Sequence, residues 1–142
     1  MIAIGCDHGG FHLKQEVVKY LENKGIKFID CGTHSEASVD YPDYAKAACS
    51  KITAGECEAG ILICGTGIGI SMVANKQKGI RAALCNEPLS AQLTRQHNNA
   101  NVLCLGGRII GAELALAIVD AFMNTPFSGE QRHIKRINLI EN

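Results

Sequence analysis

The chain lacks the features that would indicate a nucleic-acid or membrane partner. Its 142 residues carry 14 basic and 14 acidic side chains, so no excess charge favours nucleic acid or an anionic membrane. No apolar run approaches the length of a membrane span. The first residues, Met1–Gly5, have neither the basic region nor the long apolar region of a signal peptide. We therefore expect a cytoplasmic protein that binds neither nucleic acid nor membrane.

Paired cysteine spacings are also missing. The seven cysteines show no spacing typical of a zinc ribbon or a thiol-redox motif, and their number is odd. Five of them lie at or near the ends of expected strands. We interpret them as mostly buried, reduced thiols of a cytoplasmic protein, and we expect no metal site.

The sequence has no linker, internal repeat or low-complexity tract, and 46% of its residues are hydrophobic, which is typical of one packed domain. Short apolar runs predict strands over Ile2–Cys6, Ile26–Cys31, Gly60–Cys64, Ile80–Cys85 and Asn101–Leu105. Longer amphipathic segments predict helices over Phe11–Asn23, Pro42–Thr53, Ile68–Lys76, Pro88–Gln96, Ala112–Asn124 and Glu130–Glu141. This alternation favours an α/β fold: a Rossmann-like, doubly wound parallel sheet of about five strands, flanked by helices, with a C-terminal helix.

Most of the expected strands are continuous apolar runs, as in strands buried on both faces, whereas Ile26–Cys31 alternates and is expected at an edge. Ligands of such sheets bind beyond the carboxyl ends of the strands. Polar and glycine residues follow these ends: Asp7–Gly10 after the first strand, Cys64–Gly69 after the third, and Gly106–Arg108 after the fifth. We expect them to converge at one edge.

The segment Cys64-Gly65-Thr66-Gly67-Ile68-Gly69 joins a strand to a helix, and it is the most informative motif of the chain. A dinucleotide fingerprint would need a sixth-position glycine, where Ile70 stands, and a P-loop would need Gly-Lys-Ser/Thr. Glu87 lies near the distance of a ribose-binding acid, which is weak support for a dinucleotide. A helix N-terminus beside a thiol suits an anion or a reaction that develops negative charge. A tight structural turn with a buried strand-end thiol is the alternative.

Other candidate residues also have two interpretations. Asp7 and His8 are either functional or part of a helix cap. Tyr41 either stacks on a small ligand or belongs to the core. His97 either acts in the site or complements the C-terminus of its helix. Arg132 and Arg136 are four residues apart and form a basic cluster with His133 and Lys135. The cluster is either a solvated basic face or a clamp for a phosphate group. In the second case Arg108 adds a third cation.

Six segments follow one another in the order of a known family: Gly5–Gly10, Asp40–Pro42, Cys64–Gly69, Ala74–Lys76, Gly79–Arg81 and Arg95–Asn98. Together they resemble the motifs of type B ribose-5-phosphate isomerases, a family that also contains isomerases of galactose 6-phosphate and allose 6-phosphate. The resemblance spans residues 1–142 as a single sugar-phosphate isomerase domain. It implies an aldose–ketose isomerase of the pentose phosphate pathway that interconverts ribose 5-phosphate and ribulose 5-phosphate without a metal or an organic cofactor.

The resemblance also implies roles for single residues. Cys64 matches the base that moves a proton between C2 and C1 through an enediolate, and His97 matches the residue that opens the sugar ring, assisted by Asp7. A second branch of the family uses instead a glutamate at the position of Ile70, which cannot accept a proton. The N–H groups that match the binding site of the enediolate oxygen are those of Gly65, Gly67, Ile68 and Gly69. The residues that match polar contacts with the sugar are Thr66 and Asn98. The residues that match the phosphate-binding end are His8, Arg108, Arg132 and Arg136.

His97 precedes the fifth strand, so it is expected at the sheet edge opposite Cys64. We therefore expect a homodimer with shared active sites, with a tetramer as the alternative, in which His97 and Asn98 enter from a second subunit. Two functional alternatives remain open. One is an isomerase of allose 6-phosphate or galactose 6-phosphate, and the other is a non-catalytic sugar-phosphate-binding module.

Overall fold

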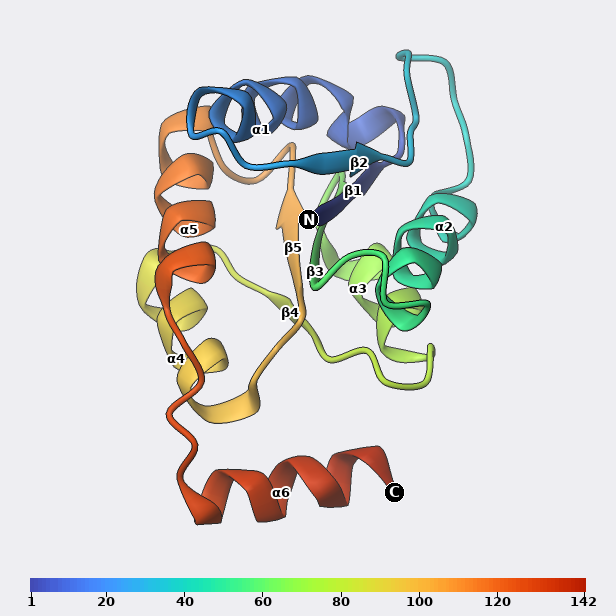
Figure 1. Ribbon diagram of the computed structural model, residues 1–142. Helices are drawn as coiled ribbons and strands as arrows, with labels where there is room; N and C mark the ends of the chain where they lie inside the picture. Colours follow the sequence, from blue (N-terminus) through green and yellow to red (C-terminus); the bar gives the residue numbers. More distant parts are fainter.

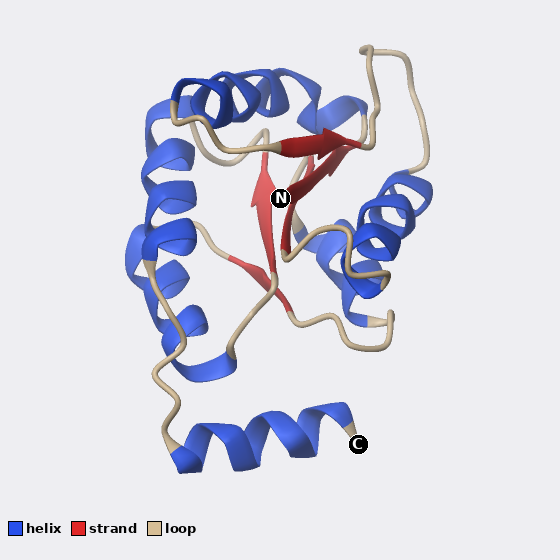
Figure 2. Cartoon of the chain, in the orientation of Figure 1, coloured by secondary structure: helices blue, strands red, loops and turns tan.

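The computed structural model describes residues 1–142, and its centre is a five-stranded parallel sheet with the order β2-β1-β3-β5-β4 (Figures 1 and 2). The three central strands are β1 (Ile2–Cys6), β3 (Ala59–Cys64) and β5 (Val102–Gly106). The edge strands, β2 (Phe28–Asp30) and β4 (Ala82–Leu84), are shorter. The predicted fold class is confirmed, and so is the edge position of the second strand.

Helices cover both faces of the sheet. One face carries α1 (Phe11–Asn23), α4 (Pro88–Asn98) and α5 (Ala112–Asn124), and the other carries α2 (Tyr41–Thr53) and α3 (Ile68–Asn75) (Figure 1). A short 3₁₀ helix, η1 (His8–Gly10), precedes α1, and α6 (Gln131–Glu141) lies apart from the two layers. No helix is long and apolar enough to cross a bilayer.

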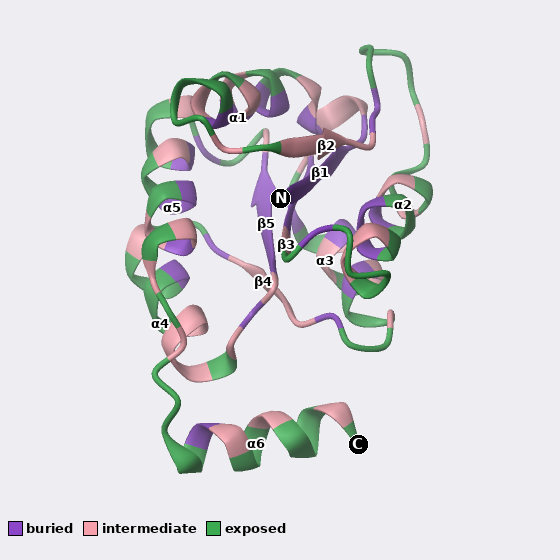
Figure 3. Cartoon of the chain, viewed as in Figure 1, coloured by how far each residue is buried: buried purple, intermediate pink, exposed green.

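The alternation of side chains along β3 explains the two apolar layers. Ile61 and Ile63 belong to the larger buried cluster, under α1 and α5, whereas Leu62 and Cys64 belong to the smaller one, under α2 and α3. Because both faces are covered, the central strands are buried except at Ala59, the first residue of β3 (Figure 3). Their continuous apolar sequence follows from this double burial.

The strand register determines where the functional segments meet. Cys6 pairs with Ile63, and Cys64 pairs with Gly106, so the three central strands end at nearly the same level. The turns that follow β1, β3 and β5 are therefore neighbours at the carboxyl edge of the sheet. Helix α6 lies at the amino edge, as Figure 1 shows.

Candidate active site

The turn after β3 points a backbone N–H at a thiol. Gly67 has φ +78°, a left-handed conformation that glycine adopts without strain. The Gly67 N–H donates to the Sγ of Cys64 over 3.1 Å. Helix α3 begins at the next residue, so its positive N-terminal end also lies beside the sulfur. Both features favour negative charge on Cys64.

Four more backbone donors surround this turn. The N–H groups of Gly65, Thr66, Gly69 and Ile70 have no acceptor within the chain, whereas the Ile68 N–H is used by the hydroxyl of Thr66 at 3.1 Å. Unpaired N–H groups at a helix N-terminus form an anion-binding site. The geometry therefore supports the anion-binding interpretation of the glycine-rich turn, although the Ile68 N–H is not free for a ligand.

Glycines after three strands let the backbone segments approach closely. A Cβ at Gly107 would lie 2.6 Å from the carbonyl oxygen of Gly9, and a Cβ at Gly9 would lie 3.0 Å from the nitrogen of Gly65. The exposed side chain of Arg108 lies over Gly65, with its Nη1 3.5 Å from an ideal Cβ there. The structure thus brings Arg108 to the glycine-rich turn, as the sequence predicts.

Asp7 and His8 follow β1 at the same edge. Asp7 is buried and caps η1, because its Oδ1 accepts the N–H of Gly10 at 3.2 Å; this leaves the other carboxylate oxygen, Oδ2, without a partner in the chain. The Nδ1 of His8 accepts the N–H of Val39 at 3.2 Å. When Nδ1 accepts a hydrogen bond, the neutral ring carries its proton on Nε2, so His8 presents a donor to a ligand.

Tyr41 closes one side of the turn. A Cβ at Gly69 would lie 2.7 Å from Cζ and 2.8 Å from Oη of Tyr41, so the phenol ring rests against the first turn of α3. The Tyr41 side chain remains exposed, which keeps it available to a ligand. Only glycine at position 69 allows this contact.

A buried lysine that was not predicted from the sequence fixes the loop before Tyr41. Lys14 is fully buried on α1, and its Nζ donates to both carboxylate oxygens of Asp30 at 2.8 and 2.9 Å and to the carbonyl oxygen of Thr33 at 2.6 Å. The loop that leaves this anchor supplies the Val39 N–H that holds His8. The available signal was the helical spacing of Lys14 with the apolar positions Val17 and Leu21.

Other thiols are buried in the core, and burial changes their chemistry. Burial raises the pKa of Cys6, Cys49 and Cys85 to about 11, and it raises the pKa of Cys104 well above the ordinary value. These thiols stay protonated at neutral pH and act as small apolar side chains. All seven cysteines are free, as the sequence predicts.

His97 and Asn98 lie far from Cys64. They end α4 at the amino edge of the sheet, where the imidazole of His97 stacks on that of His133, with ring centroids 4.6 Å apart. The predicted separation of His97 from Cys64 is confirmed. Glu87, at the other end of α4, caps the helix by accepting the Ser90 N–H at 2.9 Å, which gives it a structural role in place of a dinucleotide contact.

Arg132 and Arg136 lie on α6, on the same side of the molecule as His97. Both are exposed, and Arg132 pairs with Glu130 at 2.8 Å. The grouping of His133 with these cations is wrong: His133 is buried, and burial together with the charge of Arg132 lowers its pKa from the ordinary value. His133 is therefore a neutral packing partner of His97 and not a member of a basic face.

The candidate residues consequently form two groups at opposite edges of the sheet. Asp7, His8, Tyr41, the turn from Cys64 to Gly69, and Arg108 share the carboxyl edge, whereas His97, Asn98, Arg132 and Arg136 share the amino edge. A cavity of about 660 Å³ also opens at the amino edge, between Arg81, Arg95 and the end of α5. Its arginines are engaged with main-chain carbonyl groups, so the cavity does not replace the site at Cys64.

Comparison with known proteins gives a consistent result along the whole chain. Residues 2–140 match the family model described as Ribose/Galactose Isomerase. The chain is 52% identical over 139 residues to ribose-5-phosphate isomerase B of Escherichia coli, covering 98% of this chain and 93% of that protein. It is 44% identical over 146 residues to a galactose-6-phosphate isomerase subunit of Clostridium acetobutylicum, covering 100% of this chain and 84% of that protein.

Solved structures of similar proteins have the same fold as this chain. A ribose 5-phosphate isomerase from Thermotoga maritima superposes with a TM-score of 0.96 at 56% identity, covering 99% of this chain and 96% of that one. Ribose-5-phosphate isomerase B from Clostridium thermocellum gives a TM-score of 0.97 at 48% identity, covering 99% and 94%. Both likenesses extend over the strands, the turns that follow them and the C-terminal helix.

Proposed function

Because this chain belongs to the ribose/galactose isomerase family, we propose that it is an aldose–ketose isomerase that interconverts ribose 5-phosphate and ribulose 5-phosphate. The observation that carries the proposal is the Sγ of Cys64, held at 3.1 Å by the Gly67 N–H beside four unpaired backbone donors. The names of the relatives with 52% and 56% identity support the pentose phosphate as substrate.

The chemistry follows from this geometry. Cys64, as a thiolate, takes the proton from C2 of the open-chain aldose and returns it to C1, and an enediolate forms between the two transfers. The negative charge that develops on oxygen is stabilised by the free N–H groups of Gly65, Thr66 and Gly69, with about 3–4 kcal/mol per well-placed donor as a guide. Ile70 is buried and carries no group that accepts a proton, which leaves Cys64 as the base. No cofactor enters this scheme.

His97 opens the furanose ring and Asn98 contacts the sugar in this proposal, and Asp7, through its free carboxylate oxygen, handles a hydroxyl proton. The phosphate binds to His8 and Arg108 and to the clamp formed by Arg132 and Arg136. A remote phosphate holds the reacting carbons in place, so its binding energy contributes to the rate of proton transfer.

These assignments need residues from both edges of the sheet in one site, which supports a homodimer with shared active sites. Each site then takes its thiol and glycine-rich turn from one subunit and its His97 from the other. Exposed apolar side chains on elements near the carboxyl edge also favour a partner: Ile68, Met72, Leu89, Leu93 and Ile109. Sedimentation measurements test this, and a monomer at the concentrations used for activity would contradict it.

The substrate is tested by a coupled assay with ribose 5-phosphate, allose 6-phosphate and galactose 6-phosphate at matched concentrations. We expect the highest kcat/KM for ribose 5-phosphate. The galactose-6-phosphate isomerase subunit at 44% identity is the observation that favours a hexose phosphate as the second candidate. Binding of all three without turnover would favour a non-catalytic module. The free thiols fit our proposal that the enzyme works in the cytoplasm, in the pentose phosphate pathway.

A further inference from the structure

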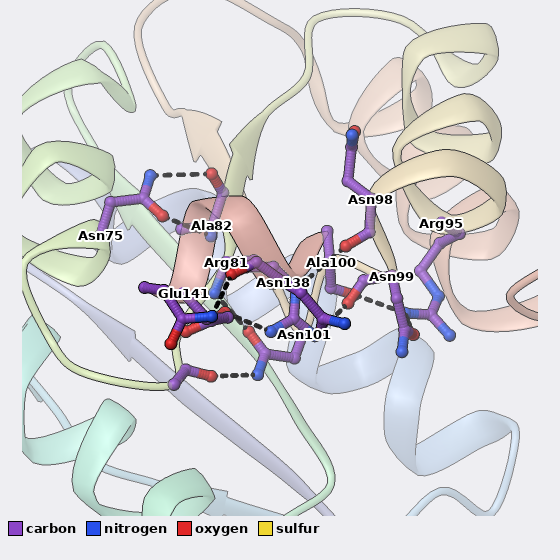
Figure 4. A network of polar contacts seen from close by, with 12 residues as sticks. Asn75, Arg81, Ala82, Arg95, Asn98, Asn99, Ala100, Asn101, Asn138 and Glu141 are labelled. Carbon is purple, nitrogen blue, oxygen red and sulfur yellow. Dashed lines mark hydrogen bonds and ion pairs between the residues drawn. The ribbon is translucent and has the colours of Figure 1, made fainter. Parts of the chain in front are cut away.

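Arg81 occupies an unusual position at the amino edge of the sheet, one residue before β4. Its guanidinium group reaches two separate parts of the chain (Figure 4). The Nε donates to the carbonyl oxygen of Asn98 at 3.0 Å, and the Nη2 donates to that of Asn99 at 2.9 Å. The Nη1 pairs with Glu141 at 2.5 Å. The proposed mechanism does not use Arg81.

The first two contacts fix the turn that directly follows His97. The last carbonyl groups of a helix have no partner within the helix, and Asn99 leaves α4 with φ +45°, a left-handed conformation. The planar fork of Arg81 satisfies two of these carbonyl groups at once. Arg95 binds the next carbonyl group of the turn, because its Nη1 donates to the carbonyl oxygen of Ala100 at 2.5 Å (Figure 4).

The third contact anchors the end of α6. Of the 11 residues of this helix only His133 is buried, so apolar packing contributes little to its placement. His133 ties the start of α6 to His97 by stacking, and Glu141 ties its last turn to Arg81. Both ties therefore lead to the same turn at the end of α4.

We propose that Arg81 is a positioning residue for the isomerase reaction, and that one guanidinium group sets both the His97–Asn98 turn and helix α6 with its phosphate-binding arginines. The inference rests on the proposed function. Two kinetic effects are then separable. The contacts with Asn98 and Asn99 act on ring opening and hence on kcat, and the contact with Glu141 acts on phosphate binding and hence on KM.

Single substitutions separate the two contacts. Glu141→Gln removes only the charged tie to α6, and we expect KM for ribose 5-phosphate to rise about two- to fivefold with kcat nearly unchanged. Arg81→Lys keeps a cation near Glu141 but loses the fork, so we expect kcat to fall about tenfold with a smaller effect on KM. Inorganic phosphate, used as a competitive inhibitor, should show the same loss of affinity in Glu141→Gln.

The matched control is Glu56→Gln, which breaks the exposed ion pair with Lys51 at the far end of α2 and should leave both constants at wild-type values. Amide hydrogen exchange gives a readout that does not need turnover. Exchange should become faster across α6 in Glu141→Gln, and at Asn99 and Ala100 in Arg81→Lys, with urea unfolding confirming the fold.

The outcomes divide clearly. Variants with wild-type KM, kcat and exchange rates overturn the role of Arg81. A wild-type protein that turns over none of the three sugar phosphates overturns the proposed function, and the exchange measurements still decide whether Arg81 holds the turn and the helix. The same rise in KM in Glu141→Gln and Glu56→Gln would show a general effect of charge, which also contradicts the proposal.

Discussion

Replacing Gly67 by alanine tests whether the backbone geometry at the thiol depends on glycine. The left-handed conformation, φ +78°, costs an alanine about 1–2 kcal/mol. In addition, the new Cβ would lie 2.5 Å from Cδ1 of Leu84 and 2.8 Å from the carbonyl carbon of Leu105. The leucine methyl group can move, but the backbone of β5 is buried and paired, so overpacking adds about 1–3 kcal/mol. We expect Gly67→Ala to lower the free energy of unfolding by about 2–5 kcal/mol.

Gly79→Ala is the matched control for this substitution. Gly79 has nearly the same backbone conformation, φ +83°, but an added Cβ meets nothing within 4 Å. It should therefore lose only the conformational term of about 1–2 kcal/mol. The assay is urea unfolding of both variants, accompanied by turnover of ribose 5-phosphate. Gly67→Ala should also lose activity, because the Gly67 N–H moves away from the Sγ of Cys64. Equal stability losses in the two variants, with turnover retained, would refute the reasoning.

Three further predictions concern single side chains. Cys64→Ser should lower kcat about 10²–10⁴-fold while inorganic phosphate still binds; a variant with more than a tenth of the wild-type rate contradicts this. Lys14→Met leaves Asp30 without its cation and should cost about 2–3 kcal/mol in urea unfolding, since Asp30 is 26% exposed; a loss below about 0.5 kcal/mol would count against it. His133 should titrate below pH 6.5 by NMR. Its neutral form is favoured in the folded state, so its contribution to stability is present above pH 6.5 and is lost as the pH falls; a titration at or above 6.5 would disprove it.

The central part of the fold was predictable because strands that are buried on both faces have continuous apolar sequences. β1 and α1 begin and end where the apolar runs predict, at Ile2–Cys6 and Phe11–Asn23. The edge strands are shorter than predicted. The run Ile80–Cys85 pairs only over Ala82–Leu84. At its start the N–H of Arg81 donates to the side-chain Oδ1 of Asn101 at 2.8 Å and not to a strand carbonyl group. Such side-chain contacts depend on distant segments, which the local pattern does not show.

The same distinction applies to the candidate site. The rule that ligands bind at the carboxyl edge was sufficient to group Asp7, His8 and Cys64, since each follows a buried strand directly. The roles of Lys14 and Arg81 were not predictable, because each acts through groups 16 or more residues away in the chain. Tertiary packing decides which cation is buried, and the spacing of residues along one helix indicates that burial only weakly.

The central claim is that one active site uses Cys64 of one subunit and His97 of another. The direct test is a heterodimer of one Cys64→Ala chain and one His97→Ala chain. The two chains carry different affinity tags, and the heterodimer is purified by both tags in succession. One of its two sites then holds both intact residues, so we predict about half of the wild-type turnover per dimer, while each variant alone stays nearly inactive. A purified heterodimer no more active than the two single variants would contradict the claim.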